Sequence, residues 1–442
     1  MGELILLVGF SLVGTLIGFF TGLIPGIHVN NVAFTLLTLS PAIFRIIEGS
    51  PLPQGFLPLC VASLVISASV AHTFLSFIPT AFFGAPEGDT ALSLLPAHHM
   101  LLEGRGYEAV SLSAVGSFCA VVSAFLLLLP FKFVFSAPLH FYGILDAVLL
   151  FLLLGISALL ILTESFNERL MPMQAVLLAL LVFMLSGALG YSILNTELMN
   201  ISNGLFNSYR VSLLFPALTG LFGVASLLYS AAHAPDIPAQ VLKEPEIDKS
   251  ELTKSIAAGT LFGSVVGFLP GITAAHATVF AMLARRNRAP EQIILTLSSV
   301  NTANAIFCTA ALFLILKPRS GALIAVSELI SVEPWGGIIP PLSLCYLLIS
   351  VLVASFFSYF ATMLVGRRLS AIFTRLPYQL VVFGILTLLF ALVFLFNGVF
   401  GMLVMLVATC IGLVPIYLGV RRSHCMGVLL LPIILFYANI SL

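Results

Sequence analysis

Apolar stretches long enough to cross a lipid bilayer recur along the whole chain. Each runs for roughly 17 to 25 residues, the length of helix that spans a hydrocarbon core of about 30 Å. Their apolar residues do not alternate with polar ones at every second position, as the strands of a membrane barrel would. Since 60% of the residues are hydrophobic and 8% charged, against about 25% charged in soluble domains, the sequence predicts an all-α polytopic membrane protein.

The charges and the cysteines limit the partners and cofactors that the sequence supports. The 442 residues include 18 basic and 18 acidic side chains and carry no net charge, so nothing favours a nucleic acid as a partner. The first segment, 1–23, begins with Glu3 and lacks a small-residue cleavage site, so we interpret it as a retained helix. The six cysteines are scattered singly; we expect them to pack as small apolar residues, with no metal and no cofactor.

One segment of the chain occurs twice. Residues 14–27, GTLIGFFTGLIPGI, align without a gap with residues 259–272, GTLFGSVVGFLPGI, and eight of the fourteen positions are identical. In both copies three glycines four residues apart fall on nearly one helical face, where a second backbone can approach closely, and Pro-Gly then breaks the helix. The segments after each copy correspond in order, which indicates two structural repeats.

The repeats predict the domain organisation. Residues 1–233 form the first repeat, 234–254 a polar, proline-containing cytoplasmic linker that we expect to be exposed, and 255–442 the second repeat. Each repeat is expected to hold a Pro-Gly-broken re-entrant helical hairpin and about five transmembrane helices. The expected spans are 55–83, 109–136, 143–163, 172–192 and 211–232, and then, after a hairpin at 255–284, 291–316, 338–366, 378–396, 398–420 and 424–440.

The basic residues predict the orientation. With the linker inside, thirteen of the 18 basic side chains are cytoplasmic and five are outside, as the positive-inside rule requires. The five outside are Arg45, Lys132, Arg210, Lys317 and Arg319. Because the first repeat has an odd number of crossings, the second has the inverted topology, and both termini are expected outside the plasma membrane.

The two Pro-Gly breaks form the predicted substrate site. Interrupted helices at corresponding places of inverted repeats indicate a transporter's binding site near the bilayer midplane. A helix that starts inside the membrane has about four N–H groups without an intrahelical partner and the positive end of its dipole, so it can bind a carboxylate or a phosphate. The candidate residues are Pro25, Gly26, His28, Asn30 and Asn31 in the first repeat and Pro270, Gly271, Thr273 and His276 in the second.

The long spans after the breaks carry polar residues at membrane depth, where polar side chains usually face a cavity or the protein interior. His72 and Thr73 in one span recur as Asn301, Thr302 and Asn304 in the equivalent span, so we expect these five to line the cavity. Hydrogen bonding between helices is the alternative interpretation.

The remaining ionisable residues give weaker signals. Asp146 and Glu164 lie at the two ends of one span and are expected to face water, with proton coupling as the alternative. His99 and Glu103, four residues apart, lack a clear third metal ligand. The sequence is compatible with either of two coupling ions. Na⁺ would be bound by carbonyls freed at the breaks, and H⁺ would be bound by His28, His72 or His276.

The glycine-rich opening at 14–27, its repetition at 259–272, and the loop GAPEGDTALSLLPAHHMLLEGRGYEAV at 84–110 together resemble the TctA family, the large permease subunit of tripartite tricarboxylate transporters. The archaeal branch, in which a histidine follows Pro-Gly-Ile, is the most similar. The resemblance implies a cation-coupled secondary transporter of organic anions that works with a small membrane subunit and an extracytoplasmic binding protein. The acidic, histidine-bearing loop departs from the Gly-Thr-Pro-Ser-Ser type of the bacterial permeases, so the resemblance does not by itself imply citrate-like specificity.

The sequence therefore predicts a permease, not an enzyme. We expect a secondary active transporter for small organic anions such as di- and tricarboxylates, which holds the anion between two re-entrant helix N-termini and works by alternating access. The second hypothesis is a flippase for polyprenyl phosphate, whose headgroup would suit the same helix ends. The third is a membrane-embedded lipid-modifying enzyme that uses His98, His99 and Glu103.

Overall fold

The protein is helical throughout the part of the chain that the structure describes. The computed structural model describes residues 2–24, 27, 29–47, 54–83, 90, 94–136, 139, 141–167, 169–195, 213–232, 238–269, 274–285, 289–373 and 378–439. Pro25, Gly26, His28, Pro270, Gly271 and Thr273 lie outside these residues, as do the side chains of Asn31, Asp146 and His276.

The helices of the first half follow the predicted spans closely. Helix α1 covers Gly2–Leu23, α2 Val29–Ile47, α3 Leu57–Leu75, α4 Phe77–Phe83, α5 Leu94–Leu102, α6 Gly106–Phe135, α7 Phe141–Leu162 and α8 Pro172–Asn195. A further, shorter apolar segment is built from α9 (Leu214–Leu218), a π-helical turn at Thr219–Val224 and α10 (Ala225–Ala232).

The second half has the same kinds of element. Helix α11 covers Lys249–Val266, α12 Ala274–Arg285, α13 Pro290–Leu314, α14 Gly321–Leu329, α15 Leu342–Phe373, α16 Tyr378–Leu418 and α17 Gly427–Tyr437. Within the described residues, eight helices are long and apolar enough to cross a membrane, which confirms the predicted class of protein. Helix α1 is one of them, so its place in a re-entrant hairpin, like the inverted topology, stays a prediction.

Both helix breaks fall where the sequence places them. Helix α1 ends at Leu23 and α2 begins at Val29, while α11 ends at Val266 and α12 begins at Ala274. Proline cannot donate to the helical ladder, and glycine tolerates conformations outside it, so the two Pro-Gly pairs account for the interruptions.

The repeated glycines lie where two backbones meet, as predicted. A Cβ added at Gly14 or Gly18 would lie 2.2 or 2.3 Å from the carbonyl oxygen of Leu64 or Ala68 on α3. In the second half, a Cβ at Gly263 would lie 2.5 Å from the carbonyl oxygen of Val300 on α13. Helix α1 therefore packs on α3 as α11 packs on α13, each along a stripe that only glycine permits.

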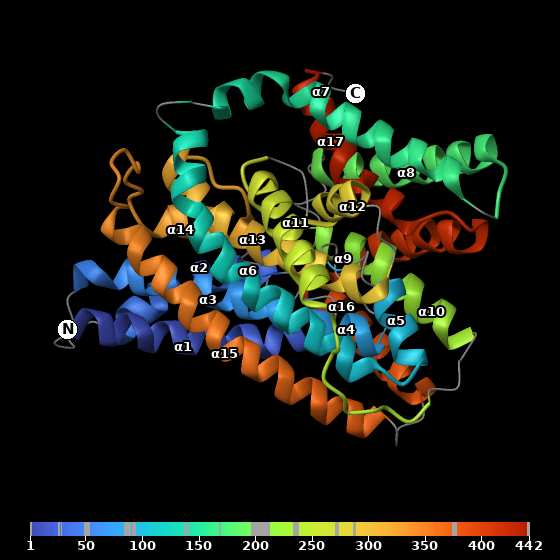
Figure 1. Cartoon of the computed structure of the whole chain (residues 1–442), viewed down its shortest axis with the longest axis horizontal. Helices are drawn as coiled ribbons and strands as arrows, with labels where there is room; N and C mark the ends of the chain where they lie inside the picture. Colours follow the sequence, from blue (N-terminus) through green and yellow to red (C-terminus); the bar gives the residue numbers. More distant parts are fainter. Residues whose placement is uncertain are drawn as a thin grey trace.

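The two halves pack into each other. Helix α3 of the first half packs against α15 of the second, and α13 of the second packs against α6 of the first. Each half also packs a short helix against the other half. Helix α14 of the second half lies on α2 and α3 of the first, and α5 of the first half lies on α13 of the second. Figure 1 shows α1, α3 and α15 along one side of the molecule and α7, α8 and α17 along the other.

The described part of the linker, residues 238–248, is irregular and largely exposed, but it is attached to the start of α6. The Gln240 side chain accepts a bond from the Gly106 backbone (2.9 Å), and Glu244 accepts one from the Tyr107 hydroxyl (2.9 Å). Arg105, beside this contact, bonds both Glu108 and Glu291, each at 2.7 Å. Because Glu291 begins α13, this cluster joins the two halves.

Helix α16 contains the break that the sequence places between two spans, at residue 397. Gly398 has φ 62° and ψ −158°, a region that essentially only glycine occupies and that costs other residues about 1–3 kcal/mol. We expect Gly398→Ala to lower the free energy of unfolding by about that amount, measured by thermal unfolding in detergent. Gly384→Ala is the control, because a Cβ there meets nothing within 4 Å; equal losses in both variants would contradict the assignment.

Candidate anion cavity between the helix breaks

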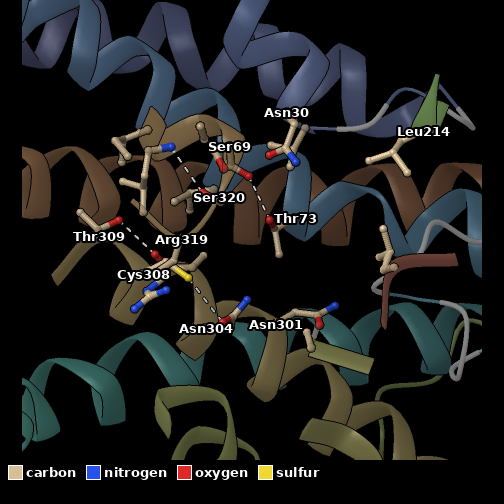
Figure 2. Close-up of a pocket in the computed structure, with 18 of the residues that line it drawn as sticks. Asn30, Ser69, Thr73, Leu214, Asn301, Asn304, Cys308, Thr309, Arg319 and Ser320 are labelled. Carbon is tan, nitrogen blue, oxygen red and sulfur yellow. Dashed lines mark hydrogen bonds between the residues drawn. The ribbon is translucent and has the colours of Figure 1, made fainter. Parts of the chain in front are cut away.

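A cavity of about 240 Å³ lies where the two interrupted helices restart. The first turn of α2 and the first residue of α12 both line it, together with the polar middles of α3 and α13. In Figure 2, Asn30 and Thr73 lie on one side of the cavity and Asn301 and Asn304 on the other. The lining residues are Val29, Asn30, Ile66, Ser69, Val70, Thr73, Leu214, Phe215, Leu218, Ala274, Asn301, Asn304, Ala305, Cys308, Thr309, Arg319, Ser320, Ala322, Leu323 and Leu429.

Four of the residues singled out in the sequence meet in this cavity: Asn30, Thr73, Asn301 and Asn304. His72 lies outside the lining; it is buried, and its Nδ1 lies 3.2 Å from the Thr21 hydroxyl on α1. Thr302 is also buried and outside the lining. The other predicted site residues lie outside the described part of the chain, or their side chains do.

A third helix starts at the cavity besides α2 and α12. Ser320 lines the cavity and caps α14, where its hydroxyl accepts a bond from the Leu323 N–H (3.3 Å). Gly321 brings this start against α2, since a Cβ there would lie 2.7 Å from the Asn30 Cβ. Three helix N-termini therefore border one space, and each contributes about half a positive charge.

Arg319 brings a full positive charge to the cavity. Among the described lining residues it is the one charged side chain. Its Nη2 donates to the Tyr142 hydroxyl (2.7 Å), and its guanidinium lies 5.2 Å from the centre of that ring. Its Nε is buried, and no described residue bonds to it. The arginine side chain is thus held on one side by Tyr142, at the edge of the cavity that it lines.

The sequence reasoning missed Arg319 as a site residue. The sequence placed this arginine only among the five basic residues expected outside the membrane. Lys317 lies beside it and donates to the same Tyr142 hydroxyl (3.1 Å), but it does not line the cavity. The signal in the sequence that could have indicated Arg319 was the position of its loop, directly before a short helix.

The polar side chains of the wall leave few donors besides Arg319. The Thr73 hydroxyl donates to the Ser69 carbonyl and the Thr309 hydroxyl to the Ala305 carbonyl, both at 3.0 Å. Asn301 is 7% exposed, and none of the described residues bonds its Oδ1. Asn304 Oδ1 accepts a bond from Cys308 Sγ at 3.5 Å, so the polar groups of this wall are two amides, Asn301 and Asn304, beside the charge of Arg319.

The expectation that Glu164 faces water is wrong. Its side chain is 1% exposed and accepts bonds from Arg421 Nε (2.6 Å) and Asn167 Nδ2 (2.8 Å), with His424 Nε2 at 2.8 Å. The reason is that residues 163–166 turn inward as a 3-10 helix at the end of α7 and meet the loop before α17. His99 and Glu103, in contrast, pair at 3.4 Å on the surface, and burial lowers the pKa of His98.

These features define a multi-pass membrane protein with a solute-sized, positively charged cavity at its helix breaks. The chain matches the Tripartite tricarboxylate transporter TctA family over residues 8–427. It therefore belongs to this family, whose members are permease subunits of transporters. An uncharacterized protein of Methanocaldococcus jannaschii is 27% identical over 97% of this chain and 98% of its own length. No solved structure matches the chain.

Proposed function

We propose that this protein is a secondary active permease for small organic anions such as di- and tricarboxylates. The observation that carries the proposal is the cavity itself, which joins the starts of α2, α12 and α14 to the partly buried side chain of Arg319. Membership of a family of transporter permeases supports the same conclusion.

The charge of the cavity favours a multivalent anion. Arg319 contributes one positive charge, and three helix N-termini contribute about half a charge each, which together make about 2.5. No acidic residue is found among the described lining residues. Because charges interact more strongly in a water-poor interior than in water, an anion of two or three charges gains most from this site.

The size of the cavity favours a small solute. Pockets for drug-sized ligands measure about 300–1,000 Å³, and this cavity holds about 240 Å³, which suits an anion of a few carbon atoms better than a polyprenyl chain. A lipid phosphate can present only its headgroup here, so the flippase is the second candidate.

The transport cycle follows from two halves that pack into each other around one site. In the proposed cycle, the halves rock about the cavity and expose it alternately to the two sides of the plasma membrane, with both termini outside. Downhill entry of Na⁺ or H⁺ drives the anion. A small membrane subunit and an extracytoplasmic binding protein are the proposed partners, as in the tripartite systems of the family.

Equilibrium binding to the purified protein tests the proposal. We expect succinate or citrate to bind and to raise the unfolding temperature, and Asn301→Ala to weaken the binding by about tenfold, the loss of one hydrogen bond to a charged group. Thr302→Ala is the matched control one residue away, outside the lining. Stabilisation by polyprenyl phosphate and not by any carboxylate would favour the flippase, and no effect of either anion would refute the site.

A further inference from the structure

A buried ionic cluster joins the two halves at a distance from the cavity lining. Glu164, in the 3-10 helix Thr163–Phe166 after α7, is 1% exposed, and His424, in the 3-10 helix Arg422–Met426 before α17, is 0% exposed. Their side chains meet with His424 Nε2 at 2.8 Å from Glu164 Oε2. We call these two residues the Glu164–His424 pair.

The hydrogen bonds determine the protonation states of the pair. Glu164 accepts bonds from Arg421 Nε (2.6 Å), the Arg421 backbone N–H (3.2 Å) and Asn167 Nδ2 (2.8 Å), and a carboxylate with several such donors is kept in its charged form. His424 must then donate through Nε2, because an ionised carboxylate only accepts. In the neutral imidazole this leaves the lone pair on Nδ1.

His424 Nδ1 is the atom that can take up a proton. It is buried, and no described residue forms a hydrogen bond with it. A proton added to this lone pair would give an imidazolium whose charge is stabilised by the Glu164 carboxylate, 2.8 Å from Nε2. No bond has to break for this step.

The pair is connected to the cavity through two of its walls. His424 precedes Leu429 of α17, which lines the cavity, by five residues, or about 8.5 Å along the helix axis. The neighbouring Arg422 donates to the Leu221 (3.1 Å) and Phe222 (2.7 Å) carbonyls of the π-helical turn. That turn directly follows α9, whose Leu214, Phe215 and Leu218 line the cavity.

We propose that His424, held by Glu164, is a proton-binding site and that its protonation is linked to anion binding in the cavity. The proposal rests on the proposed function and assigns H⁺ as the linked ion. Coulomb's law gives the sign: an anion in the cavity stabilises a nearby positive charge, so anion binding favours the protonated histidine. Anion affinity therefore falls as the pH rises.

The other charged and titratable groups described near the pair are not expected to bind the proton in its place. Arg421 and Arg422 stay protonated throughout the physiological range, as does Arg169, whose side chain lies near Gly419. Cys425, next to His424, is fully buried, which disfavours its thiolate. Helices α8, α16 and α17, which pack around the pair, contain no Asp, Glu, Lys or Arg, and α7, which ends beside it, contains one acid, Asp146, near its opposite end.

The test is the pH dependence of succinate affinity, measured by calorimetry between pH 6 and 8.5 on the purified protein, after subtraction of succinate's own titration. For the wild-type protein we expect the dissociation constant to rise with pH across this range, by up to about tenfold per pH unit where one proton is taken up with each succinate. Two buffers of different ionisation enthalpy should report uptake of about one proton per succinate. In Glu164→Gln and His424→Gln the constant should change by less than about twofold per unit.

Glu251→Gln is the matched control, because Glu251 also pairs with an arginine, Arg285 at 2.7 Å, but lies on α11 away from the cavity lining. It should keep the wild-type pH slope, and if Glu164→Gln does not fold, His424→Gln decides. A wild-type affinity that does not depend on pH, or slopes retained in both pair variants, would overturn the inference and leave the proposed function intact. Failure of the wild-type protein to bind any carboxylate would refute the proposed function instead.

Discussion

Replacing Arg319 by alanine is expected to lower the affinity for succinate or citrate by about a hundredfold or more. Removing one partner of a buried charged contact costs roughly 2–5 kcal/mol, and 1.4 kcal/mol corresponds to a factor of ten. Arg319 is the one charged side chain among the described cavity-lining residues. Arg319→Lys should recover part of the affinity, because it restores the charge without the paired donors of the guanidinium. Equilibrium binding to the purified variants measures both effects.

Lys317→Ala is the matched control for Arg319. Both residues donate to the Tyr142 hydroxyl, at 3.1 and 2.7 Å, but only the arginine lines the cavity. We expect the lysine variant to bind within about threefold of wild type, since a charge outside the site contributes little once solvent screens it. Equal losses in the two variants would show that the net charge of the loop matters, and not the contact with the ligand.

Gly18→Ala is expected to lower the free energy of unfolding by about 2–3 kcal/mol. The added Cβ would lie 2.3 Å from the Ala68 carbonyl oxygen and 2.7 Å from the Ala71 Cβ, so α1 and α3 must move apart, and overpacking of this kind costs roughly 1–3 kcal/mol. Gly263→Ala should have a similar effect at the contact of α11 with α13. Thermal or denaturant unfolding in detergent provides the measurement.

Gly9→Ala tests whether the close contact causes the loss. Gly9 lies on the same helix as Gly18, but a Cβ there meets nothing within 4 Å. Alanine is a better helix former than glycine by up to about 1 kcal/mol, so this variant should be as stable as wild type or slightly more stable. A comparable loss at both positions would contradict the role assigned to the glycine stripe.

Much of the fold was predictable because the features that define a membrane helix lie close together in the sequence. Apolar length predicted the spans, glycine spacing predicted that another backbone approaches α1 closely, and Pro-Gly predicted where α2 and α12 begin. The boundary predicted at residue 397 lies next to the observed break at Gly398, which adopts a conformation that other residues avoid.

The site was predictable only in part, because its remaining residues come together through tertiary packing. Asn30 was indicated as a cap of the helix after the first break, and Thr73, Asn301 and Asn304 were indicated as polar residues in the long spans that follow the two breaks. Arg319 lies in a polar loop, and its inward direction depends on how α14 packs against α2. The burial of Glu164 was missed because its partners, Arg421 and His424, are more than 250 residues away in the chain.

A structure determined with a saturating carboxylate tests the central claim most directly. We predict one succinate or citrate between the starts of α2 and α12, with a carboxylate within hydrogen-bonding distance of the Arg319 guanidinium and of Asn301 or Asn304. The same ligand bound elsewhere, with the cavity between the helix breaks left empty, would contradict the account.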